Sequence, residues 1–581
     1  MKTSQTKNEA RTNGKKTLRT GARNIFRVLF AATMALFTLS VPSLHATDAT
    51  WVGTTSGVWS VATNWNGGVV PGSTAAGDTS LVTFNNNTNT TITYPSGDWV
   101  VSGITFTGNT IGAFTIGTNA NAMNLDTSVG VHTLQTTADV NNAQTINAPL
   151  RMRGSGTYTF LSNATDAAAT LNFGGNFTNL ATIGLILDGS NTGSNTISGS
   201  IQGTWNIKKQ GASLWILTGS NSYNQKTTIT GGVLSVGTLA NGGTNSGIGA
   251  SINVATNLVL AGGALQYTGA EQSTDRLFSV GTSGGTLDAS GSGAVNFTNT
   301  GAMGFNSENG SRTLTLTGNN TGVNTLAAVI GDQVGATALT KSGAGNWTIS
   351  GNNTYTGNTT VTAGTLVLSA GGSIANSTVI RVQSGAGFDA SAGGFQLQNG
   401  QTLQNKGTFT GSLTALSGST YAPGNSPGIA TQAGALALNT GSTFEWELVA
   451  NSSANPGTNF DQTQFTTGGL TIESGVIASL VFNYAGSSVD WTNAFWDTNQ
   501  SWTLFSGAST LSTFGGIFGT TTVGVDSLGS TLSAGRGSFS FSTSGNDVIL
   551  NYAAVPEPAI WWLLAGAGTF FTVVRRRSTK A

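Results

Sequence analysis

The chain contains no cysteine and only two histidines. The first absence excludes disulfides, thiolate metal sites and cysteine nucleophiles, so stability outside the cytoplasm would rest on packing and backbone hydrogen bonds. His45 lies in the N-terminal segment, which leaves His132 alone in the rest of the chain. One histidine rules out a histidine-based zinc site and argues against a Ser/His/Asp triad. We expect no cofactor and no metal.

Charge is also scarce, because only 8% of the residues are charged, against about 25% in an ordinary soluble domain. Between Thr47 and Pro558 there are 11 basic and 22 acidic residues. The basic residues do not cluster as phosphate neutralisation requires, so nucleic acid is excluded as a partner. Gly reaches 82 of 581 residues, yet 38% of the chain is hydrophobic. This composition predicts an ordered, glycine-punctuated fold with few helices.

Residues 1–46 have the pattern of a secretory signal peptide. Eight basic residues precede Ala46, and the apolar run Val28–Val41 lies between the last of them and that small residue. A basic region, an apolar region and a small residue at the cleavage point are the three elements of such a peptide. An uncleaved anchor is the alternative interpretation. In either case we expect the Sec machinery to export the bulk of the chain.

A second apolar segment, Ala559–Val574, lies close to the C-terminus. As a helix it would span about 24 Å at roughly 1.5 Å per residue, which is short for a hydrocarbon core of about 30 Å. Arginines follow at its end, and the positive-inside rule predicts that they stay cytoplasmic. We therefore expect a transmembrane helix over 559–574, with the long central part of the chain outside.

A Pro-Glu-Pro tripeptide stands immediately before this segment. The tripeptide, the apolar helix and the arginine run together resemble the PEP-CTERM sorting signal of bacteria with an outer membrane, here over 555–581. In that family, the membrane protease–transpeptidase exosortase recognises the motif and removes the helix, and substrates reach the cell surface or the extracellular polysaccharide matrix. A plain C-terminal anchor is the alternative. The resemblance implies a sorting and processing motif formed by Pro556, Glu557, Pro558, Arg575, Arg576 and Arg577.

An internal repeat occupies the middle of the chain. The stretch "KQGASLWILTGSNSYNQKTTITGGVLSV" (Lys209–Val236) aligns without gaps with "KSGAGNWTISGNNTYTGNTTVTAGTLVL" (Lys341–Leu368), and 12 of 28 positions are identical. Within the unit the apolar residues alternate with polar ones, as in strands, and Gly or Asn stands between the strands. Shorter copies of the last corner recur as "GGVL", "GGAL" and "GGTL" at Gly231, Gly262 and Gly284. Such repetition predicts the stacked coils of a solenoid.

This unit resembles the autotransporter-associated β-strand repeat, whose fold is a right-handed parallel β-helix. The segments "WVGTTSGVWSVATNW" (Trp51–Trp65) and "YAPGNSPGIA" (Tyr421–Ala430) resemble the opening and closing segments of such repeats in PEP-CTERM proteins. The resemblance implies an all-β chain with a parallel β-helix over 47–430. From about Leu436 the strands lengthen and acids become more frequent, which predicts a separate β-sandwich-like module over 431–554.

Two groups of side chains could carry chemistry. Glu445 and Glu447 project from one face of a strand, as the paired carboxylates of a glycosidase do. A solvated outer face explains them more simply, and Asp461 fits an Asx turn. Trp491, Trp496 and Trp502 could stack on sugar rings, although packing in the core of the C-terminal module is the preferred interpretation.

These observations favour an exported structural or adhesive protein without enzymatic activity. Its expected partners are the Sec machinery, exosortase, the inner membrane through the C-terminal helix, and extracellular polysaccharide. The alternative is a β-helix that binds or degrades polysaccharide as a lyase or hydrolase. Such an enzyme would need Lys and Arg gathered with acids in a groove.

Overall fold

The computed structural model describes residues 47–556, except 75–76, 119, 127–131, 425 and 514–515. This part of the chain is all-β, as predicted, and its only helical elements are four short 3-10 turns: η1 Ala62–Asn64, η2 Asn66–Gly68, η3 Ala255–Asn257 and η4 Ala494–Asp497. Among the described residues no helix is long and apolar enough to cross a membrane. The segments predicted to be helical within 1–46 and 559–574 lie outside the described residues.

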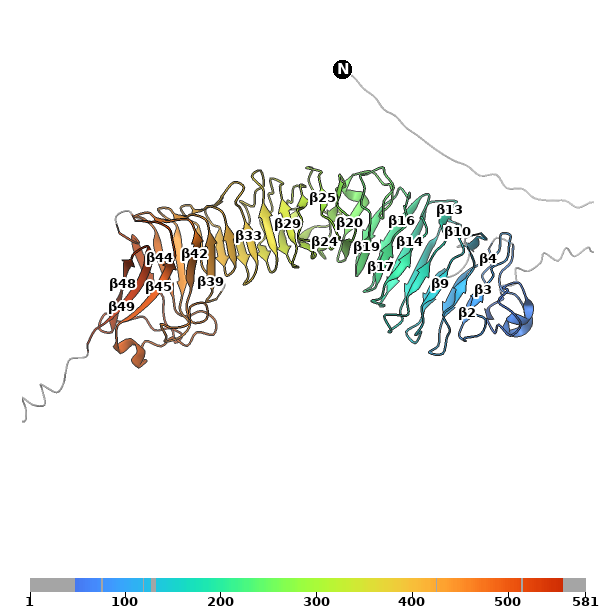
Figure 1. The fold of residues 1–581 in the computed structure, drawn as a ribbon, viewed down its shortest axis with the longest axis horizontal. Coiled ribbons are helices and arrows are strands. Elements are labelled where there is room, and N and C mark those ends of the chain that lie inside the picture. The colour runs from blue at the N-terminus through green and yellow to red at the C-terminus, as the bar shows by residue number, and fades with distance from the viewer. Residues whose placement is uncertain are drawn as a thin grey trace, which may run out of the picture. The chain divides into compact units, whose positions relative to one another are not determined.

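The fold is a solenoid whose coils stack in chain order, so that each strand pairs with the equivalent strand of the next coil (Figure 1). One ladder, which we call the long ladder, runs through nearly the whole described chain and is parallel throughout. Its strands are β3 Thr91–Ile92, β6 Thr115–Ile116, β9 Gln144–Ile146, β12 Leu171–Phe173, β15 Asn195–Ile197, β17 Leu214–Leu217, β19 Val233–Val236, β21 Ala264–Tyr267, β24 Gly285–Ala289, β26 Gly310–Thr317, β28 Val334–Lys341, β30 Thr359–Val361, β32 Val379–Val382, β35 Thr402–Asn405, β38 Thr420–Ala422, β41 Thr443–Glu447, β44 Ile477–Val481 and β47 Thr520–Val523.

Two further sheets flank the long ladder, one in each half of the chain. The 10-stranded sheet, which we call the N-terminal sheet, contains β1 Ala49–Thr50, β2 Leu81–Phe84, β5 Gly103–Phe106, β8 Thr133–Thr136, β11 Thr157–Ser162, β14 Ile183–Gly189, β16 Trp205–Lys209, β18 Thr227–Ile229, β20 Leu258–Leu260 and β23 Ser279–Val280. The 12-stranded C-terminal sheet contains β22 Gln272–Thr274, β25 Val295–Phe297, β27 Asn324–Leu326, β29 Asn346–Ile349, β31 Thr365–Leu368, β33 Gly387–Asp389, β36 Thr408–Thr410, β39 Ile429–Ala433, β42 Gln462–Thr467, β45 Gln500–Ser506, β48 Gly537–Ser544 and β49 Asp547–Ala554.

Smaller sheets complete the coils at either end. A 4-stranded sheet contains β4 Val100–Val101, β7 Met123–Asp126, β10 Leu150–Arg153 and β13 Phe177–Asn179. A 5-stranded sheet contains β34 Phe395–Leu397, β37 Leu413–Ala415, β40 Leu436–Leu438, β43 Leu470–Ile472 and β46 Leu511–Thr513.

The period of two in the sequence places one side of each strand in the core. Strands such as β17, β29 and β31 alternate half-buried and fully buried residues along their length. The three short corner copies lie in consecutive rungs of the long ladder, because Leu234 is in register with Leu265, and Leu265 with Leu287. Their leucines therefore stack inside the solenoid, which confirms that these copies mark successive coils.

The two long repeat copies differ in the faces that they occupy. The first copy alternates between the N-terminal sheet and the long ladder, through β16, β17, β18 and β19. The second alternates between the long ladder and the C-terminal sheet, through β28, β29, β30 and β31. The same sequence pattern therefore forms strands in a different pair of sheets in each copy.

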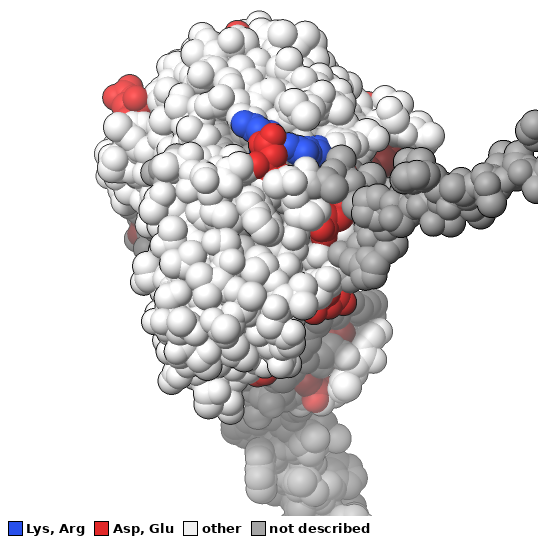
Figure 2. All heavy atoms as spheres, turned by 90° about the vertical axis from the view of Figure 1, so that its right-hand side faces the viewer, with Lys and Arg blue, Asp and Glu red and all other residues white. Residues whose placement is uncertain are grey.

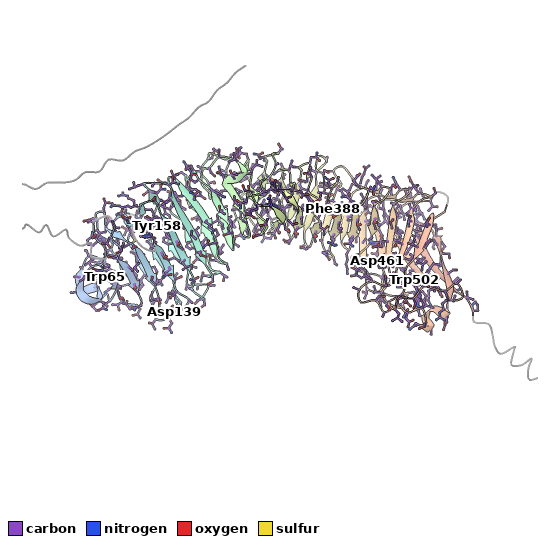
Figure 3. The ribbon with its side chains drawn as sticks, turned by 180° about the vertical axis from the view of Figure 1, so that it is seen from behind. Trp65, Asp139, Tyr158, Phe388, Asp461 and Trp502 are labelled. Carbon is purple, nitrogen blue, oxygen red and sulfur yellow. The ribbon has the colours of Figure 1, made fainter. Side chains whose placement is uncertain are left out.

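Aromatic side chains close the N-terminal end of the core. Trp51, Trp59 and Trp65 are buried, and the rings of Trp51 and Trp59 lie edge-on to Trp65 at centroid distances of 4.9 and 4.8 Å. Such edge-to-face contacts are the favoured arrangement of aromatic rings. Trp65 is labelled beside the first strands in Figure 3.

The predicted β-sandwich-like module over 431–554 is wrong. Parallel pairing continues through this range, with Phe444 of β41 in register with Ala478 of β44, and Leu436 with Leu470. Only the last strands turn antiparallel, where β49 pairs with β45 and with β48. The coils here are longer than those before, so the strands recur at a wider spacing. In the sequence, this wider spacing of the strands was interpreted as the start of a different fold.

Candidate functional site

The lysine that opens each repeat copy lies inside the solenoid. The side chains of Lys209 and Lys341 are fully buried, at the ends of β16 and β28. The Lys341 ammonium donates to the carbonyls of Ser342, Gly343 and Ala363 at 2.8, 2.9 and 3.0 Å. Lys209 binds three equivalent carbonyls at 2.6, 3.1 and 3.1 Å. Burial lowers the pKa of both lysines to about 8. Each lysine therefore joins the corners of two consecutive coils.

Other residues shared by the two copies also make matching contacts. The tryptophan indole donates to a backbone carbonyl of the preceding coil, the tyrosine hydroxyl bonds to a buried threonine, and the asparagine accepts a backbone N–H. The pairs are Trp215 with Asp188 and Trp347 with Thr317, Tyr223 with Thr227 and Tyr355 with Thr359, and Asn221 with Ile201 and Asn353 with Ile330.

The repeat therefore specifies the scaffold. Most of the shared side chains point inward or fix a corner, and Trp215, Trp347, Tyr223 and Tyr355 are at most 1% exposed. Some outward positions differ in chemistry between the copies: the half-buried Ile216 of β17 corresponds to the half-buried Thr348 of β29. The buried pair Leu217 and Ile349 also differs, but there one apolar side chain replaces another.

Several basic side chains also serve the scaffold. Arg276 and Arg312 are each 3% exposed and donate to backbone carbonyls. Arg151 and Arg153 both pair with Asp98, at 3.0 and 3.1 Å. The face shown in Figure 2 carries charged side chains only at scattered points. Most of that face is formed by uncharged residues.

The outer surface is hollowed in several places. One hollow of about 700 Å³ lies over β22, β25 and β27, and the residues at its wall include Ser273, Asn296 and Thr325. Glu271 is its one charged wall residue. A second, of about 370 Å³, is walled by residues such as Gln396, Gln398 and Thr414. Uncharged hydrogen-bonding groups of this kind suit hydroxyl-rich ligands.

The possible sugar-stacking role of Trp491, Trp496 and Trp502 is wrong. The three side chains are 4%, 0% and 1% exposed, so their ring faces cannot reach a ligand. Trp491 and Trp496 pack edge-on at 4.7 Å, and Trp496 packs on Tyr552 at 4.9 Å. All three indoles donate hydrogen bonds within the protein. These rings fill the core of the last coils, where the chain has few other large side chains.

The solvated outer face predicted for Glu445 and Glu447 is wrong for Glu447, which is buried, whereas Glu445 is half-buried. Asp461 is 0% exposed, and its Oδ1 and Oδ2 accept the backbone N–H groups of Gly428 and Glu447 at 2.7 and 3.1 Å. Asp461 therefore joins three segments of the chain and does not close the local Asx turn that was predicted. Glu447 is 4% exposed, and its Oε2 has no hydrogen-bond partner. Figure 3 shows Asp461 beside the last coils, near Trp502.

Burial governs the ionisation of this group. The pKa of Glu447 is raised to about 7, mainly by burial and also by the nearby Glu445, while Lys406 opposes the rise. Burial and the nearby Glu447 and Glu445 also raise the pKa of Asp461, although the N–H bonds from Gly428 and Glu447 oppose this rise. Across the described part of the chain, no three His, Asp or Glu side chains converge as metal ligands. Sequence reasoning missed this buried pair because no local pattern brings Asp461 to Glu447.

The predicted processing residues fall almost entirely outside the described part of the chain. Pro556, its last residue, is exposed and follows the final strand, β49. The signal-peptide cleavage residue Ala46 and the rest of the sorting motif, Glu557, Pro558, Arg575, Arg576 and Arg577, lie outside the described residues.

Comparison with known proteins bears on the repeat. The passenger-associated-transport-repeat family matches residues 207–236 and 339–368. Both long copies match this repeat. The match confirms the predicted resemblance to autotransporter-associated repeats. In addition, 166 residues, or 28% of this chain, are 43% identical to the adhesin BmaC autotransporter of Brucella suis biovar 1 (strain 1330). The chain spans only 5% of that relative's length.

Proposed function

We propose that this chain is a non-enzymatic adhesive or structural protein of the cell surface or extracellular matrix, in a bacterium with an outer membrane. The observation that carries the proposal is the repeat, in which most shared side chains serve the scaffold and polar–apolar exchanges such as Ile216 to Thr348 stand at half-buried outer positions. The similarity to a segment of an autotransporter adhesin supports the same role. In this role the solenoid acts as an extended display surface.

The composition of the outer surface supports contact with extracellular polysaccharide. Thr286, Thr315, Thr340 and Thr360 stand in register across four consecutive rungs of the long ladder, with half-buried side chains. Neighbouring rungs are about 4.8 Å apart, so their hydroxyls form an evenly spaced row. Such a row, together with the hydroxyl- and amide-walled hollows, can hydrogen-bond to a neutral glycan without any catalytic group.

Surface display and adhesion can be tested together. Cells that make the full chain should lose it to protease added outside, while a cytoplasmic marker stays intact, and cells that lack the gene should adhere less to a polysaccharide-coated support. Re-expression of the full chain should restore adhesion. Equal adhesion with and without the protein would contradict the adhesive role, and protection from protease would contradict its surface location.

The route to the surface forms the second part of the proposal. The signal peptide directs Sec export, the C-terminal helix holds an inner-membrane intermediate, and exosortase then cleaves at the Pro-Glu-Pro motif. Pro556→Ala and Glu557→Ala should each leave full-length protein in the inner-membrane fraction, whereas Val555→Ala, just outside the tripeptide, should be processed normally. Release of an unchanged, shortened product by both motif variants would contradict exosortase sorting.

A further inference from the structure

The end of β41 holds two buried carboxyl groups that the proposed function does not use. Asp461 accepts the N–H of Gly428 at 2.7 Å, across 33 residues of sequence, and the N–H of Glu447 at 3.1 Å, across 14. The carbonyl of Asp461 also accepts the Trp446 indole at 2.8 Å. Asp461 is thus the point at which the segment after β38, the end of β41 and the start of β42 are tied together.

Glu447 lies beside this junction without a hydrogen bond on its Oε2, although it is 4% exposed. A buried carboxylate oxygen without a hydrogen bond disfavours the ionised form of the group. Both oxygens of Asp461 already accept N–H groups, and charge-assisted bonds of that kind favour the ionised form. Burial and the neighbouring Glu447 nevertheless raise the pKa of Asp461, so the two carboxyl groups hold one proton and one negative charge between them.

The titratable groups around Glu447 come from four parts of the chain. Glu445 stands two residues earlier on β41, and Asp461 precedes β42. Lys406 follows β35, and Tyr484, whose own pKa Arg381 of β32 lowers, follows β44. Of these, Glu445 raises the pKa of Glu447 and Lys406 lowers it, while Tyr484 has its own pKa raised by burial and by Glu447. No ion pair within 4 Å joins Glu447 to a cation among the described residues.

We propose that Glu447 and Asp461 form a proton-dependent latch, in which one proton held by the pair keeps Gly428 docked on Asp461 and its loss loosens the coils between β38 and β42. When the latch opens, both carboxyl groups reach water and the proton is released. The device links the tightness of these coils to the pH of the surroundings.

The direction of the pH dependence follows from the raised pKa of Glu447, about 7 in the closed latch against an ordinary value of 4.5. Between these two values the closed latch binds a proton that the open one has lost, so rising pH favours opening. The opening equilibrium should grow by at most about tenfold per pH unit in this window and level off above it. The latch is therefore tightest in mildly acidic surroundings.

Hydrogen exchange of the full chain, followed by mass spectrometry, reads the latch directly, because the N–H groups of Gly428 and Glu447 are the donors to Asp461. Rates are divided by the intrinsic rate at each pH. In the wild type, the protection of peptides that contain these amides should fall by up to about 100-fold between pH 5 and pH 7. Glu447→Gln, which is permanently neutral, should keep nearly constant protection over the same range.

Glu473→Gln is the matched control, since Glu473 lies after β43 of the neighbouring coil and accepts the Thr440 N–H at 2.7 Å. It should keep the wild-type pH dependence. Asp461→Asn removes the like charge beside Glu447 and should shift the window to lower pH.

Two results would overturn the latch. One is protection that does not change with pH in the wild type, and the other is protection in Glu447→Gln that depends on pH as it does in the wild type. Millimolar calcium is added at pH 8 as a further test. If it restores protection in the wild type but not in Glu447→Gln, the site binds a cation and the proton-dependent latch is wrong.

Discussion

The buried lysine of the repeat offers the sharpest test of how the solenoid is held together. Lys341→Met keeps the length and most of the volume of the side chain but removes the three donors to the carbonyls of Ser342, Gly343 and Ala363. Those carbonyls belong to the corners of two consecutive coils. The substitution therefore tests the link between coils with little change in packing.

The expected magnitude follows from two opposing effects. A buried polar group left without its partner costs about 1–3 kcal/mol, and three carbonyls lose one. In the other direction, the variant no longer removes an ammonium from water, a penalty of several kcal/mol in proteins. We expect a net loss of about 2–4 kcal/mol in the free energy of unfolding. Lys209→Met should lose a similar amount, because its contacts are equivalent.

Urea unfolding followed by far-UV circular dichroism measures the loss, and limited proteolysis with mass-spectrometric mapping locates it. In a solenoid each coil contacts only its neighbours, so new cleavage sites should gather around the altered corner. Lys208→Met is the matched control: Lys208 stands beside Lys209 on β16 but faces solvent, and its loss should cost less than about 0.5 kcal/mol. If Lys341→Met is as mild as Lys208→Met, the proposed link between the corners is wrong.

Three further outcomes follow from the same structure. In urea unfolding at a series of pH values, the free energy of unfolding should rise between pH 8 and pH 10.5, because the buried lysines release their protons with a pKa of about 8 while those of the unfolded chain keep them. The double variant Lys209→Met, Lys341→Met should lose this rise, and an unchanged rise in that variant would contradict the assignment to the lysines. Val334→Gly should raise the melting temperature, with a gain of about 1 kcal/mol in the free energy of unfolding, because this valine is 85% exposed at φ 60, where a branched side chain is strained. Val323→Gly, at an exposed position with ordinary φ, should leave the melting temperature no higher. Gly364→Ala should lower the free energy of unfolding in urea by about 1–3 kcal/mol, since the residue lies at φ +60 and a Cβ would meet backbone oxygens at 2.3 and 2.6 Å. Gly371→Ala, where a Cβ would meet no atom within 4 Å, should be tolerated, and equal losses in the two variants would refute the steric argument.

Much of the fold could be predicted because its information is local. Alternating apolar residues predicted strands, and glycines predicted corners such as those at Gly232 and Gly364, where φ is +58 and +60. Successive corner copies also predicted the stacking of Leu234 on Leu265. These features depend on a few neighbouring residues, so they can be read in the chain before any long-range contact is known.

The candidate site could not be predicted in the same way. Glu445 and Glu447 share a strand face in the sequence, but segments far along the chain decide that Glu447 is covered. The position of Asp461 beside Gly428 and Glu447 follows from the stacking of unequal coils, which no local pattern encodes. The same uneven spacing, with Thr443 in register with Ile477 but Thr359 with Ile380, caused the error over 431–554.

The sequence by itself determined the strand period, the glycine corners, the repeat and the scarcity of charge. These are properties of neighbouring residues and of composition. Only the tertiary structure decided which face each repeat copy occupies, that the lysines and tryptophans lie inside, and that Glu447 and Asp461 share one buried junction. The physical reason is that burial and hydrogen bonding across coils arise from contacts between residues distant in the chain, and these exist only once the coils have stacked.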